Sequence, residues 1–281
     1  MFQRVLISNR GEIAIRIAKA ASDLGVESVG VFSPVDALSL HTRIATVAVE
    51  IGNGAVDDPV GAYLDADVLV AIAKESGCDC VHPGYGFLAE NAGFADRCAA
   101  AGLTFIGPSP AALSLFGDKV RARALASSLG IPVVPGSGEA LASADRAAAV
   151  AAELGYPVML KAAGGGGGRG TPDAMMESFE RCRGEAAAAF GNGDVFIEKL
   201  IDRPRHIEVQ ILADADGNVL HLHERDCSVQ LRNQKVIETA PAPGLDEGLR
   251  GRILGNAIKL MKSANYVNAG TVEFLVTPES G

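Results

Sequence analysis

An apolar segment at 158–160 is followed by Lys161, two alanines, five consecutive glycines, Arg169 and Gly170. Glycine has no Cβ, so the backbone of such a run can approach phosphate oxygens, and positive φ angles let successive N–H groups point into one concavity. Lys161 and Arg169 would supply the countercharge. The segment therefore predicts a polyphosphate-binding loop that follows a buried strand. A flexible linker is the alternative interpretation of a glycine run.

The composition is that of a soluble globular protein without a broad anion-binding face. Of 281 residues, 48% are hydrophobic and 21% charged, and the net charge is −9. A nucleic-acid or membrane surface needs a basic face, so we expect neither partner. The five cysteines are odd in number and lack metal-site spacing, which indicates free thiols in a reducing compartment. With no leader before the first strand and no run of transmembrane length, we expect a cytoplasmic protein.

Residues 1–112 are predicted to form an open α/β lobe. Apolar runs at 5–7 and 26–32 flank a helix that contains Ile13 and Ile17, which makes a βαβ unit with parallel strands. Further elements are expected at 61–76 (helix), 79–81 (strand), 90–101 (helix) and 104–106 (strand). Lobes of this kind bind ligands at the carboxyl ends of their strands, where residues 9–12 and 82–90 fall. We interpret His82 itself as a turn residue.

A connector at 113–132 contains Gly117, Asp118 and Lys119 and continues as a helix to Gly130. A second, smaller lobe is predicted over 133–203. Its elements are a helix at 145–154, the strand ending in Lys161, the glycine loop, a helix at 173–190 and a strand at 195–199. Thr171 is expected to cap the second helix and Pro172 to lie in its first turn, so no return strand is predicted after the glycines.

Residues 204–281 are predicted to begin an antiparallel lobe. Polar and apolar residues alternate over 206–212 and 219–223, and Asp216, Gly217 and Asn218 between them predict a hairpin turn. A helix at 246–263 and a strand at 271–276 follow. Lysines in a connector and before a glycine loop, with an acid on a late strand, suggest ATP bound between two lobes.

Eight motifs follow one another along the chain: SNRGEIA at 8–14, HPGYGFLAEN at 82–91, GDK at 117–119, KAAGGGGGRG at 161–170, PRHIE at 204–208, ERDCSVQ at 224–230, RNQKVIE at 232–238 and APAP at 240–243. Together, over nearly the whole chain, they resemble the biotin carboxylase branch of the ATP-grasp superfamily. The resemblance implies a mixed α/β and α+β fold, in which a Rossmann-like (pre-ATP-grasp) N-terminal lobe is followed by a partial ATP-grasp fold.

The resemblance also implies a reaction. Members of the family use ATP and Mg²⁺ (or Mn²⁺) to activate bicarbonate as carboxyphosphate, and then carboxylate biotin on a carrier protein or domain. A separate carboxyltransferase subunit or domain receives the carboxyl group, and the complete protein is expected to be a homodimer. Phosphoryl transfer depends mainly on positioning and charge neutralisation, which agrees with the cations of the glycine segment.

Site residues follow by matching positions. Lys235 matches the bicarbonate-binding lysine, and Glu273 matches the first of two acidic Mg²⁺ ligands. The other matched positions contact the nucleotide: Lys119, Lys161, Gly167 and Gly168 at the phosphates, Glu198, Lys199, Leu200 and Ile201 at the adenine, and His206, Gln230 and Asn233 elsewhere. Asn233 stands where histidine also occurs in relatives; an amide can donate a hydrogen bond but cannot titrate.

The resemblance stops at Gly281, before the family's second acidic metal ligand, its general base and the arginine that supports the biotin enolate. We therefore expect a fragment that is inactive or weakly active. Two alternatives remain at this stage. One is a non-catalytic nucleotide-binding or oligomerisation module. The other is a different ATP-grasp carboxylate–amine ligase, which shares the lysines and glycines but does not explain His206, residues 232–235 or residues 240–243.

Overall fold

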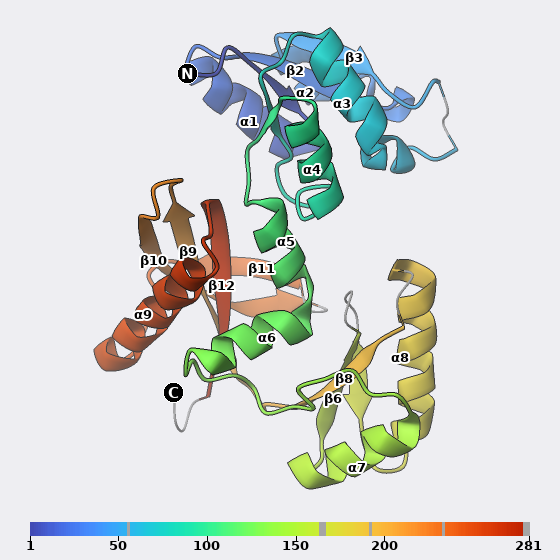
Figure 1. The fold of residues 1–281 in the computed structure, drawn as a ribbon, viewed down its shortest axis with the longest axis vertical. Coiled ribbons are helices and arrows are strands. Elements are labelled where there is room, and N and C mark those ends of the chain that lie inside the picture. Colours follow the sequence, from blue (N-terminus) through green and yellow to red (C-terminus); the bar gives the residue numbers. More distant parts are fainter. Residues whose placement is uncertain (55–56, 163–166, 191–192, 232–233, 278–281) are drawn as a thin grey trace. The chain divides into compact units, whose positions relative to one another are not determined.

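The computed structural model describes residues 1–54, 57–162, 167–190, 193–231 and 234–277 (Figure 1). The chain divides into two compact units, 1–114 and 115–281. The first unit is an open α/β structure, and the second contains two antiparallel sheets, so the predicted combination of α/β and α+β folds is confirmed.

The first unit is built on a parallel five-stranded sheet in the order β3-β2-β1-β4-β5. Its strands are β1 (Arg4–Ile7), β2 (Glu27–Phe32), β3 (Val47–Glu50), β4 (Cys80–His82) and β5 (Thr104–Phe105). Its helices are α1 (Gly11–Asp23), α2 (Leu40–Ile44), α3 (Ala66–Glu75) and α4 (Ala92–Ala100), with short 3₁₀ turns at Pro34–Asp36 and Gly61–Leu64. Alternate residues of β1 pack on opposite faces: Val5 and Ile7 with α1, and Leu6 with α3 and α4.

The first unit differs from the prediction in two places. The predicted helix at 61–76 is divided, because Asp65 leaves the helical conformation and its side chain accepts the N–H of Val68 at 3.0 Å as the cap of α3. Helix α2 and strand β3 are not predicted by the sequence. Strand β3 is a short edge strand whose side chains are mostly exposed, so it carries little hydrophobic alternation.

Two helices, α5 (Pro110–Gly117) and α6 (Lys119–Ser128), follow the first sheet along the chain and precede the small lobe. Helix α6 is confirmed, and it begins at Lys119, where the Asp118 side chain accepts the N–H groups of Val120 and Arg121. Helix α5 is an addition to the predicted connector. Lys119 is therefore the first residue of a capped helix.

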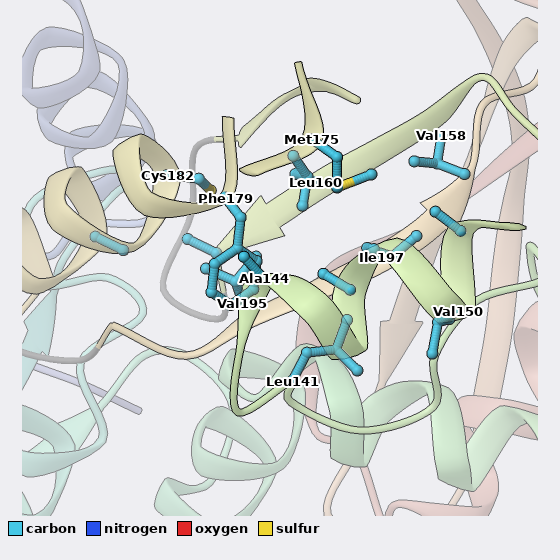
Figure 2. Close-up of a cluster of buried hydrophobic side chains, with 14 residues drawn as sticks. Leu141, Ala144, Val150, Val158, Leu160, Met175, Phe179, Cys182, Val195 and Ile197 are labelled. Carbon is cyan, nitrogen blue, oxygen red and sulfur yellow. The ribbon is translucent and has the colours of Figure 1, made fainter. Parts of the chain in front are cut away.

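The small lobe of the second unit has a three-stranded antiparallel sheet in the order β7-β6-β8. Its elements are α7 (Ala144–Leu154), β6 (Val158–Ala162), β7 (Gly167–Gly170), α8 (Met175–Phe190) and β8 (Val195–Lys199). Side chains from both helices and from alternate strand positions form one buried cluster that includes Val158, Leu160, Phe179 and Ile197 (Figure 2). Because this cluster lies on one face of the sheet, Met159 and Lys161 point to the other face.

No strand directly follows Gly170, as predicted, but the prediction that the glycine loop lacks a return strand is wrong. Residues Gly167–Gly170 form β7, which pairs antiparallel with β6 so that Gly168 lies opposite Leu160 and Gly167 opposite Lys161. The predicted cap at Thr171 and first turn at Pro172 are also wrong, since α8 begins at Met175. Gly170 packs closely on the core: a Cβ on it would lie 2.8 Å from the Met175 side chain and 3.0 Å from that of Val158.

The rest of the second unit is an antiparallel sheet in the order β11-β10-β9-β12. Its elements are β9 (Arg205–Ala213), β10 (Val219–Leu231), β11 (Gln234–Thr239), α9 (Glu247–Ser263) and β12 (Asn268–Val276). The hairpin turn is confirmed, with the Asp214 carboxylate accepting the N–H groups of Asp216 and Asn218 at 2.9 Å. Strand β10 is longer than predicted, and β11 is not predicted by the sequence. Helix α9 packs against β9 and β10.

Neighbouring methionines on α8 provide a test of the small-lobe core. Met175 is 1% exposed and Met176 is 53% exposed. We expect Met175→Ala to lower the free energy of unfolding by about 2–5 kcal/mol, because it leaves a cavity in the core. Met176→Ala, the matched control, should change it by less than about 0.5 kcal/mol. Urea unfolding followed by circular dichroism measures both, and equal effects would contradict the packing described.

Candidate functional site

Three strands bring charged side chains together on one face of the β11-β10-β9-β12 sheet. In register, Glu208 of β9 lies opposite Arg225 of β10 on one side and Glu273 of β12 on the other. Glu208 is 3% exposed. Since an isolated buried carboxylate is strongly disfavoured, its position depends on cations close by.

Two cations satisfy the Glu208 carboxylate. Lys235 of β11 donates to Oε2, and the Nε of Arg225 donates to Oε1 at 2.6 Å. Both terminal nitrogens of Arg225 also donate hydrogen bonds to Gln210 Oε1, each at 3.1 Å. Burial alone would raise the pKa of Glu208, but the hydrogen bonds from Lys235 and Arg225 outweigh it and hold this pKa below its usual value of 4.5.

Lys235 joins Glu208 to the second carboxylate of this face. Its Nζ lies 2.8 Å from Glu273 Oε1. Burial alone would lower the pKa of Lys235, but its hydrogen bonds to Glu208 and Glu273 outweigh the burial and raise that pKa well above its usual range. The lysine therefore stays protonated and is held as a fixed cation beside an acid whose side chain is 53% exposed.

His206 and Gln230 extend the same cluster. Nε2 of Gln230 lies 2.8 Å from Nδ1 of His206 and donates to the carbonyl of Cys227 at 2.8 Å. With the amide donating to Nδ1, the imidazole proton lies on Nε2, which faces Glu273 Oε1 at 3.4 Å. The structure thus brings together four sequence-predicted site residues: His206, Gln230, Lys235 and Glu273.

A second charged cluster lies on the small-lobe sheet, on the face opposite its core. Glu198 of β8 lies diagonally across from Lys161 of β6, and Lys161 Nζ is 2.5 Å from Glu198 Oε2. Arg123 of α6 pairs with the other oxygen of the same carboxylate. Two sequence-predicted residues therefore meet here, together with one that the sequence did not single out.

The predicted adenine-contacting segment lies where β8 ends. The Lys199 N–H donates to the Pro135 carbonyl at 2.7 Å, its Nζ donates to the Gly155 carbonyl at 2.7 Å, and the Leu200 N–H donates to Pro157 at 3.3 Å. Ile201 follows outside regular structure. These bonds fix the backbone of the segment from both sides.

Of the other predicted residues, Gly167 and Gly168 lie in β7, Lys119 begins α6, and Asn233 lies outside the described residues.

Sequence reasoning missed Glu208, Arg225 and Arg123 as members of the site. For Glu208 a signal was present, because it lies two positions after His206 on a strand and so must share its face. Arg225 became interpretable only with the strand register, and Arg123 only with the packing of α6 near β8.

A pocket of about 390 Å³ in the first unit is lined by residues of two predicted ligand-proximal segments, 9–13 and 85–87. Buried Asn9 joins them by donating to the carbonyls of Pro83 and Tyr85 at 2.7 and 3.0 Å. Arg10 at the pocket is held by Asp36, and that hydrogen bond lowers the pKa of Asp36 to about 2. His82 accepts the Gly84 N–H at 3.1 Å within this turn.

The acids of the first cluster fit a hard divalent cation. One ligand atom each from His206, Glu208 and Glu273 lie within 4.8 Å of one another. Glu273 offers carboxylate oxygens that reach solvent, as Mg²⁺ prefers, since it binds through few protein oxygens together with water and phosphate. Glu208 is already paired with two cations, so Glu273 is the residue that fits the metal best.

The fold and these clusters define the class of protein. A Rossmann-like lobe, a small lobe with a glycine hairpin beside a lysine, and an antiparallel sheet with acids and cations on one face form an ATP-grasp architecture. The family model "Biotin carboxylase, N-terminal domain" matches residues 1–113, and "Carbamoyl-phosphate synthase L chain, ATP binding domain" matches 118–281. The chain belongs to the biotin carboxylase family of ATP-grasp proteins, as its motifs predicted.

Known relatives agree with this assignment. Pyruvate carboxylase of Schizosaccharomyces pombe is 51% identical over 98% of the chain, and the mitochondrial enzyme of Homo sapiens is 50% identical over 98%. The chain spans about a quarter of the length of these relatives, 24% in each case.

Solved structures extend the agreement to three dimensions. The biotin carboxylase domain of Hydrogenobacter thermophilus 2-oxoglutarate carboxylase, in complex with MgADP, ADP and bicarbonate, has a TM-score of 0.96 and 41% identity, over all of this chain and 62% of that one. Campylobacter jejuni biotin carboxylase, in a β,γ-ATP complex, has the same score and identity over all of this chain and 64% of that one. Within the described residues, none of the helices is both long and apolar enough to span a bilayer.

The lowered pKa of Glu208 predicts a pH-dependent stability difference. Because the pKa is lower in the folded state than in the unfolded chain, the stabilisation is present above about pH 4.5 and is lost as the pH falls through the folded value. We expect Glu208→Gln to lower the free energy of unfolding by about 3–5 kcal/mol at pH 7, where its cations lose their partner. The difference in unfolding free energy between the wild type and Glu208→Gln should shrink as the pH falls from 4.5 toward 3.

Urea unfolding at a series of pH values measures this gap. Glu180→Gln, which changes an exposed glutamate of α8, is the control. Its unfolding free energy should depend on pH in the same way as that of the wild type. A Glu208→Gln gap that stays constant from pH 7 to pH 3 would contradict the ion pairing described.

Proposed function

We propose that this chain forms the ATP- and bicarbonate-binding part of a biotin carboxylase, which carboxylates biotin on a carrier protein through carboxyphosphate. The observation that carries the proposal is the position of Lys235, whose ammonium bridges Glu208 and Glu273 beside His206 on one sheet face. This arrangement places a permanent cation for a small anion next to an acid suited to Mg²⁺.

In the proposed reaction, a bicarbonate oxygen attacks the γ-phosphorus of ATP, forming one O–P bond as the bond to ADP breaks. The chain's contribution is charge and position. Lys235 would hold bicarbonate, and its raised pKa keeps the ammonium from losing its proton. A Mg²⁺ ion held by Glu273 would neutralise phosphate charge. His206 and Gln230, which are hydrogen-bonded to each other, would orient the nucleotide at the same face.

The remaining nucleotide contacts are proposed from the small lobe and α6. Lys119 and Lys161 would bind phosphates, with Gly167 and Gly168 over them, while Glu198 and residues 199–201 would bind adenine. Asn233 completes the proposed set. Complexes of the two neighbours named above with adenine nucleotides, one of them also with magnesium and bicarbonate, support this assignment.

We infer that the partners of the complete protein are a biotin carboxyl carrier, a carboxyltransferase and a second copy of the carboxylase. Relatives that are pyruvate carboxylases, and the H. thermophilus structure described as a dimer, support this inference. We also propose a cytoplasmic location, since five buried free thiols suit a reducing compartment.

Ligand-induced stabilisation tests the bicarbonate assignment. With MgADP at about 100 times its Kd, the unfolding free energy of the wild type should rise by about 2.7 kcal/mol, and bicarbonate should raise it further. Lys235→Gln should keep the MgADP effect and lose the bicarbonate increment, because the fixed cation is gone. Lys262→Gln, which removes an exposed charge from α9, should keep both. Absence of a nucleotide effect in the wild type would refute the proposed function.

Magnesium dependence tests the role of Glu273. We expect Mg²⁺ to tighten ADP binding by the wild type, measured by calorimetry with magnesium and then with EDTA. Glu273→Gln should abolish this difference, because an amide is a much poorer ligand for a hard cation. Glu247→Gln, at an exposed glutamate of α9, is the control. A full magnesium effect in Glu273→Gln would place the metal elsewhere.

A further inference from the structure

Glu198 is a buried carboxylate that binds two cations from different elements. The residue is 7% exposed. Its Oε2 lies 2.5 Å from Lys161 Nζ, and its Oε1 pairs with Arg123 Nη1. Among the residues that the structure describes, these are the two cations paired with this carboxylate. Each carboxylate oxygen therefore has its own partner.

The backbone beside β8 holds the Arg123 side chain in place. Nη2 of Arg123 donates to the carbonyl of Val134, so one guanidinium contacts both this loop and the carboxylate. Gly136 makes the close approach possible. A Cβ on Gly136 would lie 2.4 Å from the Ile197 carbonyl and 3.1 Å from Arg123 Nη2. The guanidinium is thus fixed by geometry as well as by charge.

The two cations differ in their access to solvent. The Lys161 side chain is 38% exposed, whereas the side chains of Arg123 and Glu198 are 19% and 9% exposed. Two positive charges and one negative charge leave a net positive charge in the cluster, and Lys161 is the member that can present it. If Lys161 alone paired with Glu198, turning its ammonium to another anion would leave a buried carboxylate without a cation, which is strongly unfavourable.

We propose that Arg123 is a positioning residue that keeps Glu198 paired, so that Lys161 can bind the phosphate oxygens of a nucleotide. This inference rests on the nucleotide binding proposed above. Arg123 acts through Glu198 and Lys161 and needs no contact with the ligand. Without Arg123, Glu198 keeps Lys161 as its partner, and the adenine-contacting segment that follows stays fixed by its backbone hydrogen bonds to Pro135 and Pro157. The removal therefore weakens the binding of phosphate groups and leaves recognition of the nucleoside unchanged.

Calorimetric titration of the full 281-residue chain with ATP and, separately, with adenosine tests this role. Arg123→Met should weaken ATP binding about tenfold, equivalent to about 1.4 kcal/mol, and leave the adenosine Kd unchanged. Arg121→Met is the matched control, since it removes the same charge from an exposed position two residues away on α6. It should leave both affinities within about twofold. Retained adenosine binding also shows that the Arg123→Met variant is folded.

The same titrations in a Glu198→Gln background separate positioning from a general charge effect. Once Glu198 is neutral, no carboxylate needs a counter-ion, so Arg123→Met should have little further effect on ATP binding. An equal loss in both backgrounds, an equal loss for adenosine, or unchanged ATP binding by Arg123→Met would each overturn the inference. If the wild type bound no ATP, the proposed function itself would fail, and the inference would fail with it.

Discussion

Burial of a carboxylate is the constraint on which this molecule's charged face depends. Glu208 is almost fully enclosed in the middle of an antiparallel sheet, where an unpaired negative charge would be prohibitive. The register of β9 and β10 supplies Arg225, and β11 supplies Lys235. The requirement to compensate one buried acid thus gathers residues that lie far apart in the sequence. The same ammonium then reaches the exposed acid Glu273, which links a structural ion pair to a surface that ligands can reach.

In the small lobe, Glu198 is a second buried carboxylate that must be paired with cations. Its sheet has one face filled by Leu160, Phe179 and their neighbours, and the opposite face carries Lys161 and Glu198. Strand periodicity of two produces this division directly. A rigid core behind the sheet fixes the charges in front of it. In both sheets of the second unit, therefore, one face packs against the core and the other carries the charged side chains. In both, a buried acid orients a lysine.

Such an arrangement suits the proposed reaction, in which the protein does little covalent chemistry. Phosphoryl transfer to bicarbonate requires that anions be brought together and their charge neutralised. Lysines whose ammonium groups are held by buried carboxylates are oriented before any ligand arrives, so less side-chain freedom is lost on binding. Gly167 of β7 complements them, because it lies opposite Lys161 in the strand register and has no side chain that could cover this lysine.

The sequence by itself determined most of the element types, the parallel and antiparallel lobes and the family, because hydrophobic periodicity and short motifs are local properties of the chain. It also predicted His206, Gln230, Lys235 and Glu273, which the structure brings together. It did not predict α2, β3, α5 or β11. Tertiary structure alone decided the strand pairing of Gly167–Gly170, the start of α8 at Met175, and the partners Arg225 and Arg123. Each of these depends on which segments lie side by side. Long-range register and packing set that proximity, and no local pattern encodes it.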